Sequence, residues 1–436
     1  MALKYVIWGC GFRGKNLCNI IPQNQIMAFV DANKSLSGGM YNGLPIISYD
    51  DYLKNYQDCI MIISPFWPHN KIAGILDRDN VPYLRTDILP PEICETVITD
   101  LFLKLDEKFF NENSILLYGL NLFSLLLRDY LTTTERSALI VPENDCSQTL
   151  LHTIKLNNPD CIGSTINENA VLYITGDFFN RNTIPACRQI DLFDFKDIFP
   201  EYYNPELEKY RNMHKGKRCF VLGTGPSLRI EDLDLLKDNN EICIASNGIF
   251  TAYESTKWRP DFYFIEDKEG YRVWKNSLLK EGYIDQMFAA DYCLAEDQGE
   301  NPFISFHVCK QYIGENCPAK FSSDFSTGAY WASTITYFCI QFAFFLGCTE
   351  IYLLGIDFTY SQKNNHFTQN YLPPEKSDYI DQTQHSAEIF PVMYEGYKTA
   401  ASVAASKGIK LMNASRSTML DAIERIDFDS LFDKNS

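Results

Sequence analysis

The chain has 436 residues, and a typical length of about 150 residues per domain makes three domains the first expectation. It carries 39 Lys and Arg against 56 Asp and Glu, a net charge of −17, which argues against a nucleic-acid polymer as partner. The content of 46% hydrophobic and 14% aromatic residues excludes a disordered chain. The fourteen cysteines are scattered without a C-x-x-C pair, so we expect reduced thiols in a cytoplasmic protein rather than zinc sites or a disulfide framework.

The chain begins with a strand, a glycine turn and a helix. An apolar strand leads into Gly9-x-Gly11-x-x-Gly14, and Asp31 ends the next strand. This spacing is that of the dinucleotide fingerprint, in which the glycines admit a phosphate to the helix N-terminus and the acid holds a ribose. We expect nucleotide or sugar-nucleotide binding here, the alternative being a Rossmann-like turn that holds no ligand. Further strands are expected at 44–47 and 59–63, in a domain of residues 1–95.

A second strand–glycine–helix pattern starts at Ser114 and reaches its turn at Gly119, without a second glycine. Strands are expected at 138–141, 170–175 and 189–193, after a helix at 123–131. These elements predict a smaller α/β domain at 96–205, to which the sequence gives no role. The stretch 194–217 contains prolines and charges and is typical of a linker helix at a domain boundary.

The third pattern is more informative. The strand at 218–222 runs into Gly223-Thr-Gly-Pro-Ser-Leu228, and a helix follows near Ile230. No Gly-Lys-Ser/Thr follows, so the loop is not a P-loop. Its amides and the Ser227 hydroxyl can hold a phosphate or ribose. The alternative is an ordinary strand-to-helix turn.

Polar residues follow three more strands of this third unit. Asn247 follows the strand at 242–245, the pair Glu266-Asp267 follows the strand at 261–265, and Asp357 ends another. Parallel α/β sheets bind ligands at the carboxyl ends of their strands. We expect Asn247 to contact a base or sugar, and the acids to hold a ribose or a divalent metal whose identity the spacing does not specify. The alternative for Asp267 is a solvated strand end.

The segment Ser322–Gly328 is expected to open a long buried helix, with its hydroxyls and amides facing an anion. Alternatively, Ser326 or Thr327 simply caps that helix. The apolar run at 337–347 lies in an uncharged stretch that polar residues interrupt. A buried helix of an α/β domain is therefore expected there, rather than a membrane span.

The segment 361–381 is polar and is interpreted as a lid or acceptor loop; it contains His366 and Tyr371. His385 precedes a helical stretch at 388–407. Histidine is the usual general base near neutral pH. Each histidine is thus a candidate proton acceptor, the alternative being a surface-loop histidine.

The order of these motifs resembles two related groups of proteins. The motifs are Gly223–Leu228, Ser246-Asn247, Ser326-Thr-Gly328 and Glu350–Phe358. One group is the bacterial sialyltransferases of the lipooligosaccharide type, which use CMP-activated sialic acid. The other is the 6-hydroxymethylpterin diphosphokinase-like family, which includes the motility accessory factors. The resemblance covers residues 215–415. Separately, Phe29–Asp31 and Tyr41–Ser48 resemble the small nucleotide-binding domains attached to bacterial sugar-modifying enzymes.

The resemblance implies roles for individual residues. Asn247 would help to hold the nucleotide sugar, Tyr360 would assist the departing phosphate, and His385 would deprotonate the acceptor hydroxyl. The resemblance also implies that the nucleotide phosphate and ribose are contacted by Gly223, Thr224, Gly225 and Ser227. It implies that the cytidine nucleotide and the sugar carboxylate are contacted by Ser326, Thr327 and Gly328.

The sequence also departs from the sialyltransferase pattern. Thr224 and the pair Glu266-Asp267 stand where those enzymes have asparagine. His366 stands near a second phosphate-assisting tyrosine, for which Tyr371 is a substitute. The stretch between His385 and the last strand is several residues longer than in the sialyltransferases.

The expected fold is α/β with three Rossmann-like units, the third a sialyltransferase-like parallel-sheet domain at 206–436. The expected function is inverting transfer of a nonulosonic or similar acidic sugar from a CMP donor to a bacterial surface glycan or glycoprotein. Two alternatives stay open: a Mg²⁺-dependent pyrophosphokinase that uses Glu266, Asp267 and Asp357, and a nonenzymatic nucleotide-sugar scaffold that binds through the Gly9 unit. Peripheral membrane contact and a homo-oligomer are left open.

Overall fold

The computed structural model describes residues 3–65, 69–86, 98–112, 114–143, 146–163, 166, 170–175, 187–192, 202–280, 286–295, 297, 301–311, 313, 318–359, 366–368 and 386–432. The chain divides into two units, one of residues 1–198 with 315–317 and one of residues 199–314 with 318–436. The first unit holds two separate sheets and the second unit holds the largest sheet. The α/β class with Rossmann-like parallel sheets is thereby confirmed, while the boundaries at 95 and 205 stay predictions.

The first sheet has the strand order β3-β4-β2-β1-β5-β6, and all of its pairings are parallel except β3 with β4. Its strands are β1 (Tyr5–Trp8), β2 (Ile26–Val30), β3 (Met40–Tyr41), β4 (Leu44–Ile47), β5 (Ile60–Ile63) and β6 (Tyr83–Arg85). The connecting helices are α1 (Phe12–Ile20), the 3-10 turn η1 (Gln23–Gln25), α2 (Tyr49–Asn55) and α3 (His69–Arg78). The strand order reverses between β1 and β5, where α/β sheets form their ligand crevice.

The second sheet is parallel throughout and has the order β10-β9-β7-β8. Its strands are β7 (Ser114–Tyr118), β8 (Ser137–Val141), β9 (Val171–Ile174) and β10 (Arg188–Asp191). Its helices are α5 (Ile98–Phe109), α6 (Leu122–Thr133), α7 (Gln148–Asn157) and the 3-10 turn η2 (Pro159–Cys161). The small α/β unit expected from the sequence is therefore present.

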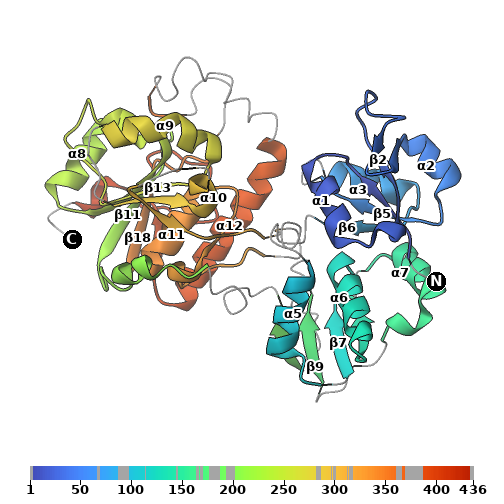
Figure 1. Cartoon of the computed structure of the whole chain (residues 1–436). Helices are drawn as coiled ribbons and strands as arrows, with labels where there is room; N and C mark the ends of the chain where they lie inside the picture. The colour runs from blue at the N-terminus through green and yellow to red at the C-terminus, as the bar shows by residue number, and fades with distance from the viewer. Residues whose placement is uncertain are drawn as a thin grey trace. The chain divides into compact units, whose positions relative to one another are not determined.

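The second unit is built on a seven-stranded parallel sheet of order β15-β14-β13-β12-β11-β18-β19, with helices against both faces (Figure 1). Its strands are β11 (Arg218–Leu222), β12 (Ile242–Ser246), β13 (Phe262–Ile265), β14 (Met287–Ala290), β15 (Phe303–Phe306), β18 (Glu350–Leu354) and β19 (Lys410–Asn413), beside a small parallel pair, β16 (Val308–Cys309) and β17 (Ala329–Tyr330). Its α-helices are α8 (Ile230–Asp238), α9 (Lys268–Lys280), α10 (Asp291–Leu294), α11 (Ile335–Phe345) and α12 (Ser386–Ser406). Its 3-10 turns are η6 (Pro205–Tyr210), η7 (Asn247–Ala252), η8 (Phe325–Thr327) and η10 (Asp429–Leu431).

Helix α11 forms the centre of the second unit's core. Every one of its residues is buried, as expected of a helix that is apolar on all sides. It packs against β11, β12, β13 and α12, and Phe342 contacts the rings of Phe264 and Phe288. The sequence-based prediction of a buried helix is confirmed. No helix in the described part of the chain is both long and apolar enough to cross a membrane.

Local structure bears on the predicted boundary stretch and on the cysteines. Within the boundary stretch 194–217, the described residues contain the 3-10 turn η6 rather than an α-helix, and residues 193–201 lie outside the described part. The described cysteines are free, and most of them are buried.

Candidate functional site

The loop after β11 packs directly on the loop after β18, where the strand order of the large sheet reverses. The Gly223 N–H donates to Leu354 O at 2.8 Å, and the Gly225 N–H donates to Gly355 O at 2.9 Å. A β-carbon on Gly223 would lie 2.6 Å from the Gly355 oxygen. A β-carbon on Gly225 would lie 2.7 Å from the same oxygen. Contact between the two loops therefore requires both glycines, and their contact with phosphate stays a prediction.

Ser227 and Asp357 join these two loops. The Ser227 N–H donates to Asp357 Oδ2 at 2.7 Å, and its hydroxyl donates to Oδ1. Asp357 is only 6% exposed. Burial raises the pKa of Asp357, while the hydrogen bonds from Ser227 oppose that rise. Both predicted site residues thus lie together, and each already uses its side chain to hold the other loop.

Thr224 and His366, predicted from separate motifs, are also neighbours. Thr224 Oγ1 lies 3.2 Å from His366 Nδ1, and the Phe367 N–H donates to Thr224 O at 2.9 Å. Burial lowers the pKa of His366 to about 4, although its interaction with the Thr224 backbone raises it. His366 is therefore neutral near pH 7 and packs on the loop after β11.

This lowered pKa predicts a loss of stability in acid. The unfolded chain protonates His366 near pH 6.5 and the folded chain only near pH 4. Above about pH 6.5, His366 is neutral in both the folded and the unfolded state, and the free energy of unfolding does not depend on its titration. Below that pH the unfolded state binds a proton that the folded state does not. The free energy of unfolding then falls by at most about 1.4 kcal/mol per pH unit. Chemical denaturation of wild type and His366→Gln at pH 7, 6 and 5 tests this. As the pH falls, wild type should lose stability relative to the variant. Parallel pH dependences of the two proteins would contradict the lowered pKa of His366.

Asn247 begins the turn directly after β12 and keeps an unused acceptor. Its φ of +52° is a conformation that asparagine tolerates better than most residues. Its backbone oxygen accepts a hydrogen bond from the Tyr263 hydroxyl at 2.7 Å. Its Oδ1 is fully buried and has no hydrogen-bond partner in the described part of the chain. A buried unpaired acceptor costs about 1–3 kcal/mol, a cost that a hydrogen bond from a ligand would remove.

The pair Glu266-Asp267 follows β13, but both carboxylates are engaged. Glu266 Oε1 accepts from the Tyr292 hydroxyl at 2.7 Å and lies 3.8 Å from Lys310 Nζ. Asp267 Oδ1 accepts the Gly270 N–H at 2.6 Å, in the first turn of α9. Burial, followed by the charge of Glu266, raises the pKa of Tyr292. Among the described residues, no group of three or more His, Cys, Asp or Glu could hold a metal ion.

The Ser326-Thr327-Gly328 segment lies elsewhere than the sequence predicted. It does not open the buried helix: α11 begins at Ile335, and Thr334 caps it by accepting the Thr336 N–H. Ser326 instead lies in the 3-10 turn η8, which Asp324 caps. The expectation that Ser326 or Thr327 stands at the N-terminus of the long helix is therefore wrong.

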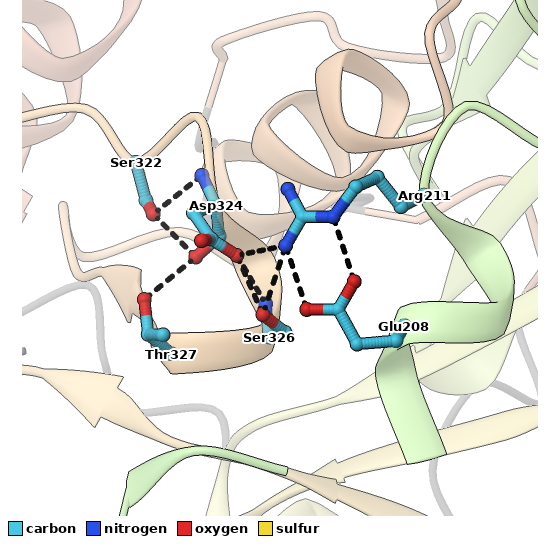
Figure 2. A network of polar contacts seen from close by, with 6 residues as sticks. All are labelled: Glu208, Arg211, Ser322, Asp324, Ser326 and Thr327. Carbon is cyan, nitrogen blue, oxygen red and sulfur yellow. Dashed lines mark hydrogen bonds and ion pairs between the residues drawn. The ribbon is translucent and has the colours of Figure 1, made fainter. Parts of the chain in front are cut away.

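The Ser326 hydroxyl belongs to a network around Arg211 (Figure 2). It donates to Asp324 Oδ1 at 2.6 Å and accepts from Arg211 at 3.2 Å. Arg211 also donates to both carboxylate oxygens of Glu208, and its hydrogen bonds lower the pKa of Glu208 to about 2. The Thr327 hydroxyl donates to Asp324 O at 3.2 Å. These hydroxyls hold the turn, and their contact with a nucleotide stays a prediction.

Gly328 ends that turn with a φ of +127°, and a β-carbon there would lie 2.8 Å from Cys309 Sγ and 3.2 Å from His307 Cδ2. His307 was missed by the sequence argument, which considered only the histidines of the 361–385 region. Its Nδ1 lies 2.5 Å from Asp291 Oδ2. The available signal was its place directly after a strand, the same signal that pointed to Asn247.

Three sequence-based candidates lie outside the described residues. They are Tyr360, Tyr371 and His385. Their proposed roles at the leaving phosphate and the acceptor hydroxyl stay predictions.

The N-terminal glycine turn has the geometry that its motif predicts. Gly9 has a φ of +101°, and a β-carbon on Gly14 would lie 1.9 Å from Gly9 O, whereas Gly11 has open space. Asp31 Oδ2 accepts the Cys10 N–H at 2.8 Å. Gly9 and Gly14 thus serve the turn itself, while Gly11 leaves room for a ligand beside α1.

The second sheet has a similar turn that is closed by a side chain. Gly119 has a φ of +111°. Asn121 follows it and is 1% exposed; its side chain accepts the Ser124 N–H at 2.9 Å and donates to Thr175 O at 2.9 Å. Helix α6 is capped by this side chain, whereas α1 has no side-chain cap. Of the two turns, the one at Gly9 is the better candidate for binding an anion.

These contacts predict different effects for substitutions of Gly14 and Gly11. Gly14→Ala should destabilise the first unit by about 1–3 kcal/mol because of overpacking. Gly11→Val should cost less, at most about 1 kcal/mol, because its β-carbon meets nothing and only the glycine at the N-cap of α1 is lost. If the first unit binds a nucleotide, Gly11→Val should also abolish that binding. Thermal unfolding and a nucleotide titration of both variants provide the test. Equal destabilisation by the two substitutions would contradict the packing argument.

Residues 195–363 match the family model described as 6-hydroxymethylpterin diphosphokinase MptE-like, and residues 1–71 match the model described as C2185-like, N-terminal. The MAf glycosyltransferase from Magnetospirillum magneticum AMB-1 is similar over 83% of this chain and 66% of its own, just under two thirds, with 13% identity and a TM-score of 0.34. None of the curated proteins compared with the chain matches it. The C-terminal region is thus similar to the MptE-like family, which confirms the resemblance that its motifs predict.

Proposed function

We propose that the C-terminal unit is a glycosyltransferase with a nucleotide-activated sugar as donor. The proposed donor is a CMP-activated nonulosonic or similar acidic sugar, and the proposed acceptor is a hydroxyl of a bacterial surface glycan or glycoprotein. The match of residues 195–363 to the MptE-like model supports a nucleotide-dependent transferase. The resemblance of the motifs after β11, β12 and β18 to sialyltransferases supports the sugar branch.

The observation that carries this proposal is the Asn247 oxygen, for which the described residues offer no hydrogen-bond partner, beside a fixed frame of two loops. Asn247 follows β12, which neighbours β11, and the loop after β11 is joined to the loop after β18 through Ser227 and Asp357. Binding sites of this kind combine a preformed frame with a few polar groups that set specificity. An amino group of a base or a sugar hydroxyl would satisfy the Asn247 acceptor, which has no hydrogen-bond partner among the residues that the structure describes.

In the proposed reaction, the acceptor hydroxyl attacks the anomeric carbon with inversion, and CMP leaves. The Tyr360 hydroxyl would stabilise the charge that develops on the departing phosphate, because the Gly223, Gly225 and Ser227 N–H groups of the loop after β11 already donate within the protein. Removing one such donor typically slows a reaction by about 10²–10³-fold. His385 is the sequence-based candidate for accepting the proton.

The pyrophosphokinase alternative is favoured by one observation, the match of residues 195–363 to the 6-hydroxymethylpterin diphosphokinase MptE-like model. Such chemistry needs Mg²⁺ across the phosphates. This alternative relies on Asp357, Asp267 and Glu266. Asp357 accepts a hydrogen bond from Ser227, and Asp267 accepts one from Gly270. Glu266 accepts one from Tyr292 and lies 3.8 Å from Lys310. Their engagement favours the glycosyltransferase. Strict Mg²⁺ dependence with AMP release from ATP would favour the alternative instead.

The test is CMP release from several CMP-nonulosonates, with and without glycan acceptors, by the full chain. Acceptor-stimulated CMP release is expected, together with stabilisation of the chain by CMP in a thermal-shift panel that includes UDP, ATP and NAD, with and without Mg²⁺. If no donor is bound or turned over, and His385→Ala behaves like wild type, the proposal fails.

A further inference from the structure

We propose that Thr418 is a positioning residue for the donor: it fixes the loop after β18 and, through it, the loop after β11. Its role at the donor rests on the function proposed above. Thr418 belongs to the 413–420 segment, which continues from β19, the neighbour of β18 in the large sheet. This segment lies beyond residues 195–363, the part of the chain that matches the MptE-like model. Its role is therefore argued from its contacts alone.

The 413–420 segment holds the backbone of the loop after β18 at three points. The Ile356 N–H donates to the Ser415 hydroxyl at 2.8 Å, and the Thr418 hydroxyl donates to Ile356 O at 2.8 Å. The Met419 N–H donates to Asp357 O at 2.8 Å. Both polar backbone groups of Ile356 and the carbonyl group of Asp357 are thus fixed by residues that follow β19.

The Thr418 hydroxyl is the centre of this contact. Besides donating to Ile356 O, it accepts the Leu420 N–H at 3.0 Å and the Asn413 side-chain amide at 3.2 Å. A hydroxyl has one hydrogen to donate and two acceptor positions, so all three are in use. Asn413 is fully buried, and its Oδ1 accepts the Ser415 N–H at 3.0 Å. A buried polar network whose members are bonded to one another favours a single arrangement.

The same loop after β18 holds the loop after β11 with its other groups. Gly355 O accepts the Gly225 N–H at 2.9 Å, and the Asp357 carboxylate accepts the Ser227 N–H at 2.7 Å. The Ile356 side chain packs so closely on Gly223 that a β-carbon there has no room. Each of the residues 355–357 therefore contacts the loop after β11, and a shift of the loop after β18 has to move both loops.

Phe358 shows that the loop after β18 depends on contacts from outside it. Its φ of +54° is a conformation that a bulky residue rarely adopts. Its ring packs against α12, with its centroid 5.1 Å from that of Phe390 and 6.0 Å from that of Tyr397. Strained backbone of this kind persists only where the surrounding structure holds it. The 413–420 segment supplies the polar part of that support, on the two residues directly before Phe358.

Three variants of the full chain separate positioning from general stability. Thr418→Val keeps the shape of the side chain and removes the hydroxyl, whereas Thr418→Ser keeps the hydroxyl. Thr256→Val is the matched control in the same unit. The Thr256 hydroxyl is also buried, donates to Asp234 and accepts the Trp258 N–H at 2.9 Å, and these partners belong to neither loop.

Hydrogen–deuterium exchange of peptides that cover residues 218–230 tests the positioning step without a ligand. Thr418→Val should speed the exchange of the amides in the loop after β11, although the bonds that it removes are made to Ile356, Leu420 and Asn413. Thr418→Ser should restore the wild-type exchange. Thr256→Val should leave the exchange of this loop unchanged, because local opening is governed by local contacts. Exchange that is unchanged in Thr418→Val overturns the proposal.

Binding and turnover test the link to the donor. Thr418→Val should weaken the binding of CMP by about 5–30-fold, the effect expected when a network of contacts leading to a site is broken at one residue. The KM for the donor should rise by a similar factor while kcat at saturating donor stays close to that of wild type, as for a loss of uniform binding. Thr418→Ser and Thr256→Val should bind CMP as wild type does.

Two results at this stage overturn the proposal. One is a Thr418→Val variant with the wild-type Kd for CMP. The other is an equal loss of CMP affinity in Thr418→Val and Thr256→Val, which would mean that general destabilisation, rather than the position of the loops, weakens binding. A wild-type protein that binds no CMP removes the proposed function and this inference with it. That failure is recognised from the wild-type titration, before any variant is compared.

Discussion

Gly225→Ala is expected to destabilise the C-terminal unit by about 1–3 kcal/mol, the usual cost of overpacking. The new methyl group would lie 2.7 Å from Gly355 O and 2.8 Å from the Asp357 carboxylate. The first of these atoms belongs to backbone that is already fixed by the Gly225 N–H. The methyl group therefore has to separate the loops after β11 and β18. We expect a lower midpoint in chemical denaturation and a weaker affinity for CMP.

Gly74→Ala is the matched control, because the same atoms are added. Gly74 lies in α3, and a β-carbon there would have nothing within 4 Å. Alanine is favoured over glycine in a helix interior by about 1 kcal/mol, so this variant should be unchanged or slightly stabilised. If both variants unfold like wild type, the two loops are not in the contact described.

Asp357→Ala is expected to cost about 2–4 kcal/mol. Two hydrogen bonds to a charged acceptor are lost, each worth about 1.5–3 kcal/mol, and the Ser227 N–H is left without its partner. The loss is partly offset because burial disfavours the ionised carboxyl, as its raised pKa indicates. Equilibrium unfolding of the C-terminal unit and CMP affinity should both be impaired.

Asp357→Asn and Ser227→Ala separate the contributions. Asparagine keeps an oxygen for the Ser227 N–H and should cost less than alanine. Ser227→Ala removes only the hydroxyl bond. In a double-mutant cycle, Asp357→Ala and Ser227→Ala should couple by about 0.5–3 kcal/mol, as contacting residues do. Additive effects would mean that the two side chains do not interact.

The fold was largely predictable because most of the parallel strands are short apolar runs that end at a glycine or a polar residue. Buried strands such as β1 and β11 have this composition, and the glycine turns after them place helices on the sheet. The same pattern located Gly223, Asn247 and Asp357 at strand ends. The motif order was sufficient to predict the MptE-like relationship that the family model confirms.

The uses of the polar side chains were harder to predict because their partners are distant in sequence. Ser326 pairs with Arg211, 115 residues earlier, and lies in η8 rather than in the first turn of α11. Thr224 meets His366 across 142 residues. No local pattern reports such pairings.

The Asp291–His307 pair shows the same limit, since each residue follows a different strand. Each residue alone is unremarkable in sequence, and the sheet register brings them together. Conversely, Glu266 and Asp267 looked like free acids because Tyr292, Lys310 and the first turn of α9 could not be placed against them from sequence alone.

The proposed function requires that the C-terminal unit binds the nucleotide of the donor, with Asn247 as one contact. Calorimetric titration of CMP into wild type, Asn247→Gly and Gly11→Val measures this binding. Glycine tolerates the φ of +52° at position 247 and removes an acceptor that is unpaired in the described part of the chain, so stability should be retained. We predict saturable binding to wild type and Gly11→Val, and at least about tenfold weaker binding to Asn247→Gly, the equivalent of about 1.4 kcal/mol. Binding that is lost in Gly11→Val and intact in Asn247→Gly, or no binding of CMP at all, would contradict the account.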